Sequence, residues 1–157
     1  MSTSEDPVRQ ATIQALGNHE GQAGNLLPIL HDIQHTLGCI PDAAVPVLSN
    51  ALQLSRAEIQ GVISFYPHFR THPPAGVVLE MCRAESCQAM GGQKLVDHAR
   101  QKLGCDFHEN STSGKVSLEP VYCLGLCAQS PAVMVNGQPY ARMTPAKLDR
   151  LLAEKGA

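Results

Sequence analysis

The chain of 157 residues has no tryptophan, only three tyrosines and three phenylalanines, and a charged fraction of 17%. The low charge leaves a largely neutral surface, which is compatible with burial in a larger complex. The net charge of −2 excludes a generally basic surface, so we expect no nucleic acid and no anionic membrane as a partner. No apolar run approaches the roughly 18 residues that cross a bilayer. The N-terminus has neither a basic start nor an apolar segment, so we expect no signal peptide, no direct membrane contact and a cytoplasmic location.

Motifs of nucleotide binding and catalysis are also missing. The sequence contains no Gly-x-Gly-x-x-Gly fingerprint, no phosphate-cradling loop and no convincing acid–base constellation. It also lacks the Cys-x-x-Cys pattern of thiol–disulfide enzymes. We therefore expect a chain that does not catalyse a reaction by itself.

What the sequence does have is six cysteines, and without a secretory signal they indicate thiols that serve metal or redox chemistry. Four of them form two pairs, Cys82 with Cys87 and Cys123 with Cys127. Each pair follows an expected strand, residues 77–81 or residues 116–122. If these strands are neighbours in a sheet, four thiolates can surround one point. The spacing predicts a metal site.

Two metal centres fit this donor set. A single structural zinc needs four sulfurs on one ion; the first pair suits it, but the Cys-x3-Cys spacing of the second is less usual. A 2Fe-2S cluster takes two cysteines on each iron, so two pairs from separate loops match its shape. Iron–sulfur is favoured and zinc stays open. Cys39 and Cys105 have no partner at ligand spacing, and we expect them to be structural.

Periodicity and turn signals predict an α/β chain in two domains, an N-terminal helical bundle at residues 1–72 and a domain with a central mixed sheet at residues 73–157. Helices are expected at residues 8–16, 26–37 and 41–52 and from Ser55 onward. The second domain reads β-α-β-β-β-α, with residues 109–115 as a loop, Pro120 at a break or sheet edge, and a hairpin turn at Asn136-Gly137. This order is compatible with a small domain of thioredoxin type.

Residues of both domains then resemble a known family. The motifs are Leu30-His-Asp-Ile-Gln34, Gly38-Cys-Ile-Pro41, Gly61-Val-Ile-Ser-Phe-Tyr66 and Cys123-Leu-Gly-Leu-Cys127-Ala-Gln-Ser-Pro-Ala132. With the four cysteines, they resemble the small thioredoxin-like 2Fe-2S subunit of NADH-linked dehydrogenases. That family occurs in NADH:quinone oxidoreductase, NAD-reducing hydrogenases and NAD-dependent formate dehydrogenases. Within it, residues 81–91 look most like the gamma subunit of soluble, molybdenum-containing NAD-dependent formate dehydrogenases. Respiratory subunits usually have Thr and Gly residues between the first two cysteines, and this chain does not.

The resemblance implies an electron carrier with one 2Fe-2S cluster, with Cys82 and Cys87 on one iron and Cys123 and Cys127 on the other. It implies a flavoprotein partner that binds FMN and NAD(H), and a large molybdopterin iron–sulfur subunit beyond it. The chain would then not bind NAD or formate itself. Two alternatives have a different kind of function. One is a zinc-stapled structural module, in which the four cysteines only fix the fold, and the other is a free-standing ferredoxin that works as a soluble shuttle. Pro131 falls where thioredoxin-type folds often carry a cis-proline.

Four further expectations concern single features. His31 and His35 are four residues apart on a helix, and we expect a packed or solvated pair rather than ligands. The aromatic stretch at residues 65–69 either packs internally or docks another subunit. Arg83 either offsets the charge of the cluster or is a solvated surface residue. Gly91, Gly92 and Gly125 would let the backbone approach the sulfurs.

Overall fold

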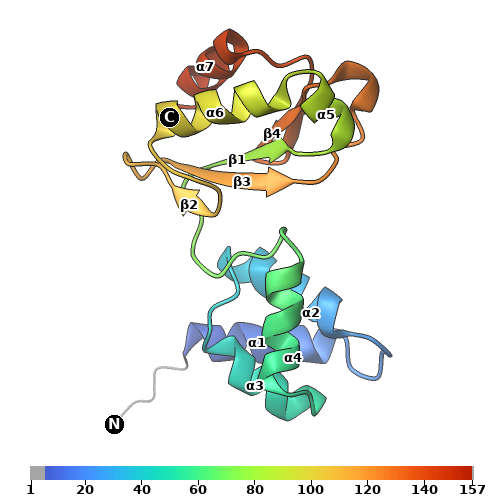
Figure 1. The fold of residues 1–157 in the computed structure, drawn as a ribbon. Coiled ribbons are helices and arrows are strands. Elements are labelled where there is room, and N and C mark those ends of the chain that lie inside the picture. The colour runs from blue at the N-terminus through green and yellow to red at the C-terminus, as the bar shows by residue number, and fades with distance from the viewer. Residues whose placement is uncertain (1–5, 157) are drawn as a thin grey trace. The chain divides into compact units, whose positions relative to one another are not determined.

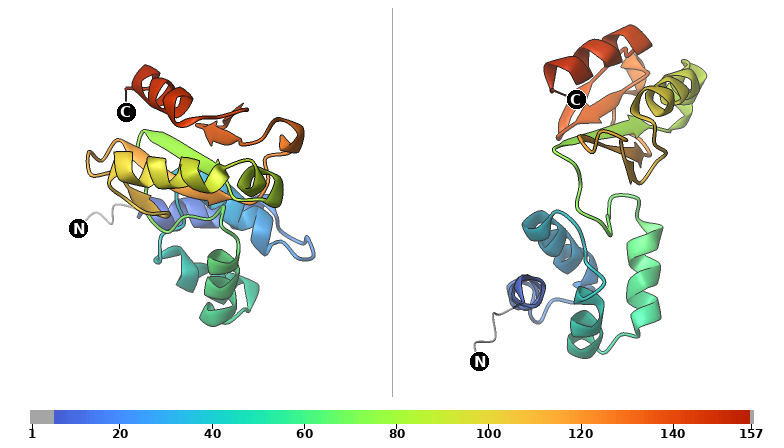
Figure 2. Two further views of the ribbon diagram at one scale, coloured as in Figure 1. Left: turned by 45° about the horizontal axis from the view of Figure 1, so that its top comes forward. Right: turned by 90° about the vertical axis from the view of Figure 1, so that its left-hand side faces the viewer.

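A computed structural model describes residues 6–156, which form two compact units, one up to Pro73 and one from Pro74 (Figures 1 and 2). The fold class predicted from the sequence, helices followed by a mixed sheet, is confirmed. We propose that the two units are the two domains expected from the linker at residues 71–76. In the described part of the chain, no helix has the length and apolar character to cross a membrane.

The first unit contains four helices, and all four were predicted: α1 (Pro7–Asn18), α2 (Leu26–Leu37), α3 (Ala44–Leu52) and α4 (Arg56–Phe65). Local signals set several of their ends. Gly38 ends α2 in a left-handed conformation with φ of 80°, and Ser55 and Glu58 form a complete capping box at the start of α4. The predicted start of the third helix is wrong by a few residues, because residues 41–43 form a turn closed by the Ala44 N–H on the Pro41 carbonyl.

The apolar stripes of these helices meet in one core, to which Ile29, Leu30, Ile33, Leu48 and Ile59 contribute fully buried side chains. A buried amide ties the chain after α4 to this core. The Gln34 side chain donates to the His68 carbonyl (2.8 Å) and accepts from the Arg70 N–H (2.7 Å). Both backbone groups are therefore satisfied by a single side chain of α2.

The second unit is a five-stranded sheet in the order β2-β3-β1-β4-β5. Its elements are β1 (Val77–Cys82), α5 (Glu85–Ala89), α6 (Gly92–Leu103), β2 (Glu109–Asn110), β3 (Val116–Val121), a 3-10 turn η1 (Cys127–Gln129), β4 (Val133–Val135), β5 (Gln138–Tyr140) and α7 (Pro145–Glu154). Strands β1 and β3 are parallel, and the other pairs are antiparallel. Both α6 and α7 pack on the face that carries Leu79, Leu118 and Val133 (Figure 1).

Most of the turn predictions in this unit hold. Asn136 and Gly137 have φ of 48° and 79°, the two positive values of a type I′ turn, and the bond before Pro131 is cis. The pairing of β2 with β3 ends at Leu118, so Pro120 lies on a stretch of β3 that β2 does not cover. Two elements were not predicted. Helix α5 carries Cys87 and was not expected there, and β2 falls inside the stretch predicted to be a loop.

Candidate metal centre

The two cysteine pairs leave the sheet at the same end. Because β1 and β3 are parallel neighbours, Cys82 lies in register with Val121, and the chain continues from both strands into adjacent loops. The Arg83 N–H donates to the Val121 carbonyl (2.7 Å) and extends this contact beyond the strands. The condition that the sequence left open, adjacency of the two strands, is therefore met.

The first pair is buried. Cys82 ends β1 with 5% of its surface exposed, and Cys87 lies in α5 with 2% exposed. Their neighbours are apolar: Ala132 is buried with them, and Val121, Leu124 and Leu126 pack against them. Burial raises the pKa of the Cys87 thiol, and the Cys82 thiol raises it further. The Ala132 N–H and the Ser130 hydroxyl act in the opposite direction, because both stabilise the Cys87 thiolate.

The second pair is exposed and tightly spaced. The sulfurs of Cys123 and Cys127 are 3.7 Å apart. Two thiolates on one tetrahedral metal, with metal–sulfur bonds of about 2.3 Å, are about 3.8 Å apart. The pair thus has the spacing of two ligands of one metal ion.

The backbone of the second loop supports this spacing. The Gly125 N–H donates to the Cys123 sulfur at 3.4 Å, as expected for a glycine beside a ligand. Cys123 itself has φ of 117°, in a region that residues with a side chain seldom occupy. Such strain costs about 1–3 kcal/mol and is typical of ligand clamps. No signal in the sequence predicted this conformation of Cys123.

Two serines connect the pairs, and sequence reasoning missed both. Ser86, from α5, lies 2.9 Å from the Cys127 carbonyl oxygen and 2.6 Å from the Ser130 hydroxyl. Ser130 in turn lies 2.6 Å from the same carbonyl oxygen. The thiols also interact electrostatically, because the pKa of Cys127 is raised first by its hydrogen bond with Cys123 and also by the charge on Cys82. The second pair therefore lies within electrostatic reach of Cys82.

The donor set fits a 2Fe-2S cluster. Within residues 6–156, no three or more His, Cys, Asp or Glu side chains are arranged to hold one metal ion together. The four thiols are arranged two by two, a buried pair and an exposed pair, and each iron of a 2Fe-2S cluster takes two thiolates. A bound metal would oppose the raised pKa values of Cys87 and Cys127, since a coordinated thiol is deprotonated.

The remaining residues singled out in the sequence have other surroundings. The Arg83 guanidinium donates to Gln93 (3.0 Å) and lies over the Phe107 ring, 5.5 Å from its centre. Cys39 is buried, and Cys105 is half-buried against the core of the sheet. Burial raises the pKa of both thiols.

The three glycines expected to approach the sulfurs have different surroundings. A side-chain carbon on Gly92 would lie 2.6 Å from the Cys87 carbonyl oxygen, so Gly92 allows α6 to start against α5. Gly91, with φ of 89°, has open space around it. Of the three glycines expected to approach sulfur, Gly125 makes a hydrogen bond to one.

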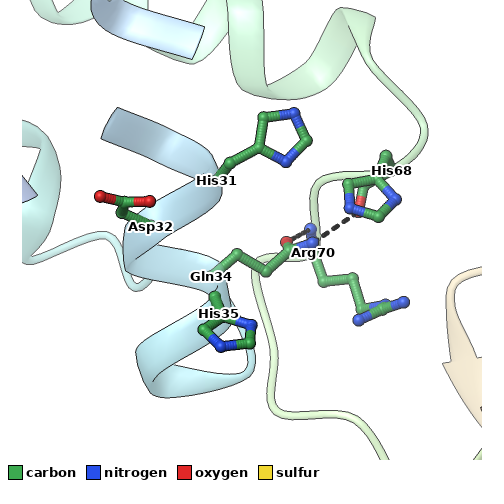
Figure 3. Close-up of a pocket in the computed structure, with 6 residues that line it drawn as sticks. All are labelled: His31, Asp32, Gln34, His35, His68 and Arg70. Atoms are coloured by element: carbon green, nitrogen blue, oxygen red, sulfur yellow. Dashed lines mark hydrogen bonds between the residues drawn. The ribbon is translucent and has the colours of Figure 1, made fainter. Parts of the chain in front are cut away.

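A cavity of about 490 Å³ lies in the first unit, and three of the residues that line it are histidines (Figure 3). The His31 ring packs against Phe69 and His68, with ring centres 5.0 and 5.2 Å apart. These two ring contacts show that His31 is a packed side chain, as predicted. The rings of His31 and His35 point in different directions in Figure 3. The aromatic stretch at residues 65–69 borders this region and has both buried and exposed members. Phe69 is buried in the helical core, whereas Phe65 is 76% exposed.

Comparison with known proteins agrees with this interpretation of the second unit and extends to the first. The sequence pattern of the family described as "Thioredoxin-like [2Fe-2S] ferredoxin" matches residues 12–155. The NADP-reducing hydrogenase subunit HndA of Solidesulfovibrio fructosivorans is 27% identical over 94% of this chain and 86% of its own length. The NADH-quinone oxidoreductase subunit 2 of Thermus thermophilus is 31% identical over 85% of this chain and 75% of its own length.

A solved structure is similar in fold. It is the crystal structure of an NAD+-reducing [NiFe]-hydrogenase in the H2-reduced state, with a TM-score of 0.66, 28% identity, and coverage of 84% of this chain and 22% of that one. The 2Fe-2S cluster predicted from the cysteine pairs is the cofactor of the matched family, which confirms that part of the prediction. The chain, in both of its units, belongs to the thioredoxin-like [2Fe-2S] ferredoxin family.

Proposed function

We propose that this chain is the electron-transfer subunit of an NAD-dependent formate dehydrogenase, and that Cys82, Cys87, Cys123 and Cys127 hold one 2Fe-2S cluster per chain. The observation that carries the ligand assignment is the convergence of two thiol pairs at one end of the sheet, one of them with sulfurs 3.7 Å apart. When bound, the cluster accepts and donates one electron at a time.

The two cysteine pairs have different surroundings and therefore different roles in electron transfer. Cys82 and Cys87 lie in an apolar surrounding, and they would hold one iron there. Cys123 and Cys127 are exposed, so they would hold the other iron at a surface that a second protein can approach. The Gly125 N–H stabilises negative charge on the Cys123 sulfur, and that charge grows on reduction.

The partner we propose is a flavoprotein subunit that binds FMN and NAD(H), with a molybdopterin iron–sulfur subunit beyond it, in the cytoplasm. Two apolar side chains near the cysteine loops support docking there, because Tyr122 directly precedes Cys123 and is 65% exposed, and Met90 after α5 is 63% exposed. Contiguous exposed apolar patches mark sites of protein–protein interaction, and we propose that these two side chains contribute to one.

The relatives named above support a second assignment. Those named above belong to an NADP-reducing hydrogenase, an NADH-quinone oxidoreductase and an NAD+-reducing hydrogenase. The equivalent subunit of such a complex is therefore the alternative. The formate dehydrogenase assignment rests on the resemblance of residues 81–91 and on their departure from the Thr- and Gly-containing loop of respiratory subunits.

The cofactor is tested by purifying the chain without oxygen and measuring iron, zinc and acid-labile sulfide. About two irons and two sulfides per chain, with an S = 1/2 EPR signal only after dithionite reduction, are expected. One zinc per chain, without sulfide or signal, would refute the electron-transfer function and leave a structural module.

The assembly is tested by co-purification from the native organism. A tagged chain is expected to bring down a flavoprotein and a molybdenum protein with formate-dependent NAD reduction. A flavoprotein recovered with hydrogenase or quinone reductase activity would refute the formate assignment and establish the alternative.

A further inference from the structure

The two cysteine loops share a cluster of three oxygen atoms. The Ser86 hydroxyl comes from α5, between the two cysteines of the first pair, whereas the Ser130 hydroxyl and the Cys127 carbonyl oxygen belong to the second loop. The three separations are 2.6 Å between the hydroxyls, 2.6 Å from Ser130 to the carbonyl, and 2.9 Å from Ser86 to the carbonyl. All three lie in the range of O–H···O hydrogen bonds.

The protons of the two hydroxyls decide how this cluster works. Two hydroxyls at 2.6 Å need a proton between them, so one serine donates to the other. The second hydroxyl proton is then free to reach the Cys127 carbonyl, which can only accept. The result is a relay that ties the helix carrying Cys87 to the backbone of Cys127. Both serines are half-buried, which limits competition from water.

The carbonyl that the two serines hold belongs to Cys127, which the proposed function assigns as a ligand of the cluster. The orientation of a ligand and its surroundings tune the reduction potential of an iron–sulfur centre. The position of the Cys127 backbone should therefore affect that potential.

We propose that Ser86 and Ser130 are positioning residues of the metal centre: together they hold the Cys127 backbone against α5 and so fix the geometry and the reduction potential of the cluster. The proposal rests on the proposed function, since it concerns the cluster that the four cysteines bind. It adds two residues, 44 positions apart in the chain, to the four that the cysteine spacing reveals.

The test is a redox titration of the full chain, followed by EPR, on the wild type and on Ser130→Ala, Ser86→Ala and the double variant. We expect Ser130→Ala to keep its iron and sulfide but to have a shifted potential and altered g values. Ser86→Ala should shift the potential less, because the Ser130 hydroxyl still reaches the Cys127 carbonyl at 2.6 Å. The shift of the double variant should differ from the sum of the two single shifts, since residues of one relay are not additive.

Two further variants separate positioning from general damage. Ser130→Thr keeps the hydroxyl and should keep the wild-type potential. Ser113→Ala removes a hydroxyl of the same unit that pairs with Ser111 at 3.0 Å, outside the cysteine loops, and should change nothing. If Ser130→Ala holds no cluster, retention of the cluster by Ser130→Thr supports the proposal, and loss in both overturns it.

The refuting results are distinct. A wild-type chain without a 2Fe-2S signal overturns the proposed function together with this inference. A wild-type chain with the signal, and a Ser130→Ala variant with unchanged potential and g values, overturns the inference alone. So do independent, additive shifts from the two serines, or an equal shift in Ser113→Ala.

Discussion

Gly92 opens α6 directly against the helix that carries Cys87, and replacing it with alanine is the sharpest test of how the site is held. The added carbon would lie 2.6 Å from the Cys87 carbonyl oxygen and 2.9 Å from the carbonyl carbon. Both are backbone atoms, so no side-chain rotation relieves the clash. Reaching an ordinary separation of 3.4 Å requires α5 and α6 to move apart by about 0.8 Å. That exceeds the roughly 0.5 Å within which a binding constellation must be held.

The expected cost follows from the same geometry. Overpacking of this kind costs about 1–3 kcal/mol, and the better helix propensity of alanine returns up to about 1 kcal/mol. We therefore expect Gly92→Ala to lower the free energy of unfolding by about 1–2 kcal/mol in urea titrations and to reduce the iron and sulfide bound per chain.

Gly61 is the matched control, because it is an exposed glycine inside α4 with no atom within 4 Å of an added carbon. Gly61→Ala should raise stability by about 0.5–1 kcal/mol and leave the iron content unchanged. A Gly92→Ala protein with wild-type iron content and wild-type stability would show that α5 and α6 do not constrain the site as argued.

Three further changes have clear expected outcomes. Cys123→Ser should lose most of the bound iron and sulfide while Cys39→Ser keeps them, and equal loss in both would contradict the ligand assignment. Gln34→Ala leaves a backbone carbonyl and a backbone N–H without their partner, so urea titration should show a loss of about 2–4 kcal/mol; a loss below about 0.5 kcal/mol would contradict this account. The hydrogen bond from His98 holds the pKa of Asp149 below its usual value, so its stabilisation is present at neutral pH and is lost as the pH falls through that lowered value. Asp149→Asn should therefore be less stable than the wild type at pH 7 and approach it below about pH 4, and a gap that persists in acid would refute the assignment.

Local rules explain which parts of the fold could be predicted. Gly38 ends a helix, Ser55 caps one and Asn136-Gly137 closes a hairpin for reasons that lie within a few residues of each position. Helix α5 has five residues, too few to show a period, and its only buried side chain is Cys87. Strand β2 has two residues and exists through its pairing with β3. Neither element has a local signal of its own.

The features of the site also separate into those that are local in sequence and those that depend on the fold. The spacing of the cysteines is local, so the four thiols could be identified as candidates from the sequence. Their convergence depends on β1 and β3 being parallel neighbours, which is a property of the sheet. Ser86 and Ser130 are ordinary serines until the fold brings them to 2.6 Å. The positive φ of Cys123 is imposed by the loop around it, and no residue nearby in sequence requires it.

The two cysteine pairs differ in burial, and this difference predicts which pair stabilises the electron that the proposed carrier accepts. Cys82 and Cys87 are 5% and 2% exposed among apolar neighbours, whereas Cys123 and Cys127 face solvent. Reduction adds one negative charge, and a charge is less costly where water and the Gly125 N–H can stabilise it than in an apolar surrounding. In the proposed function, Cys123 and Cys127 would therefore hold the iron at which the added charge is better stabilised. A partner that docks over this exposed loop would exchange electrons beside these two cysteines.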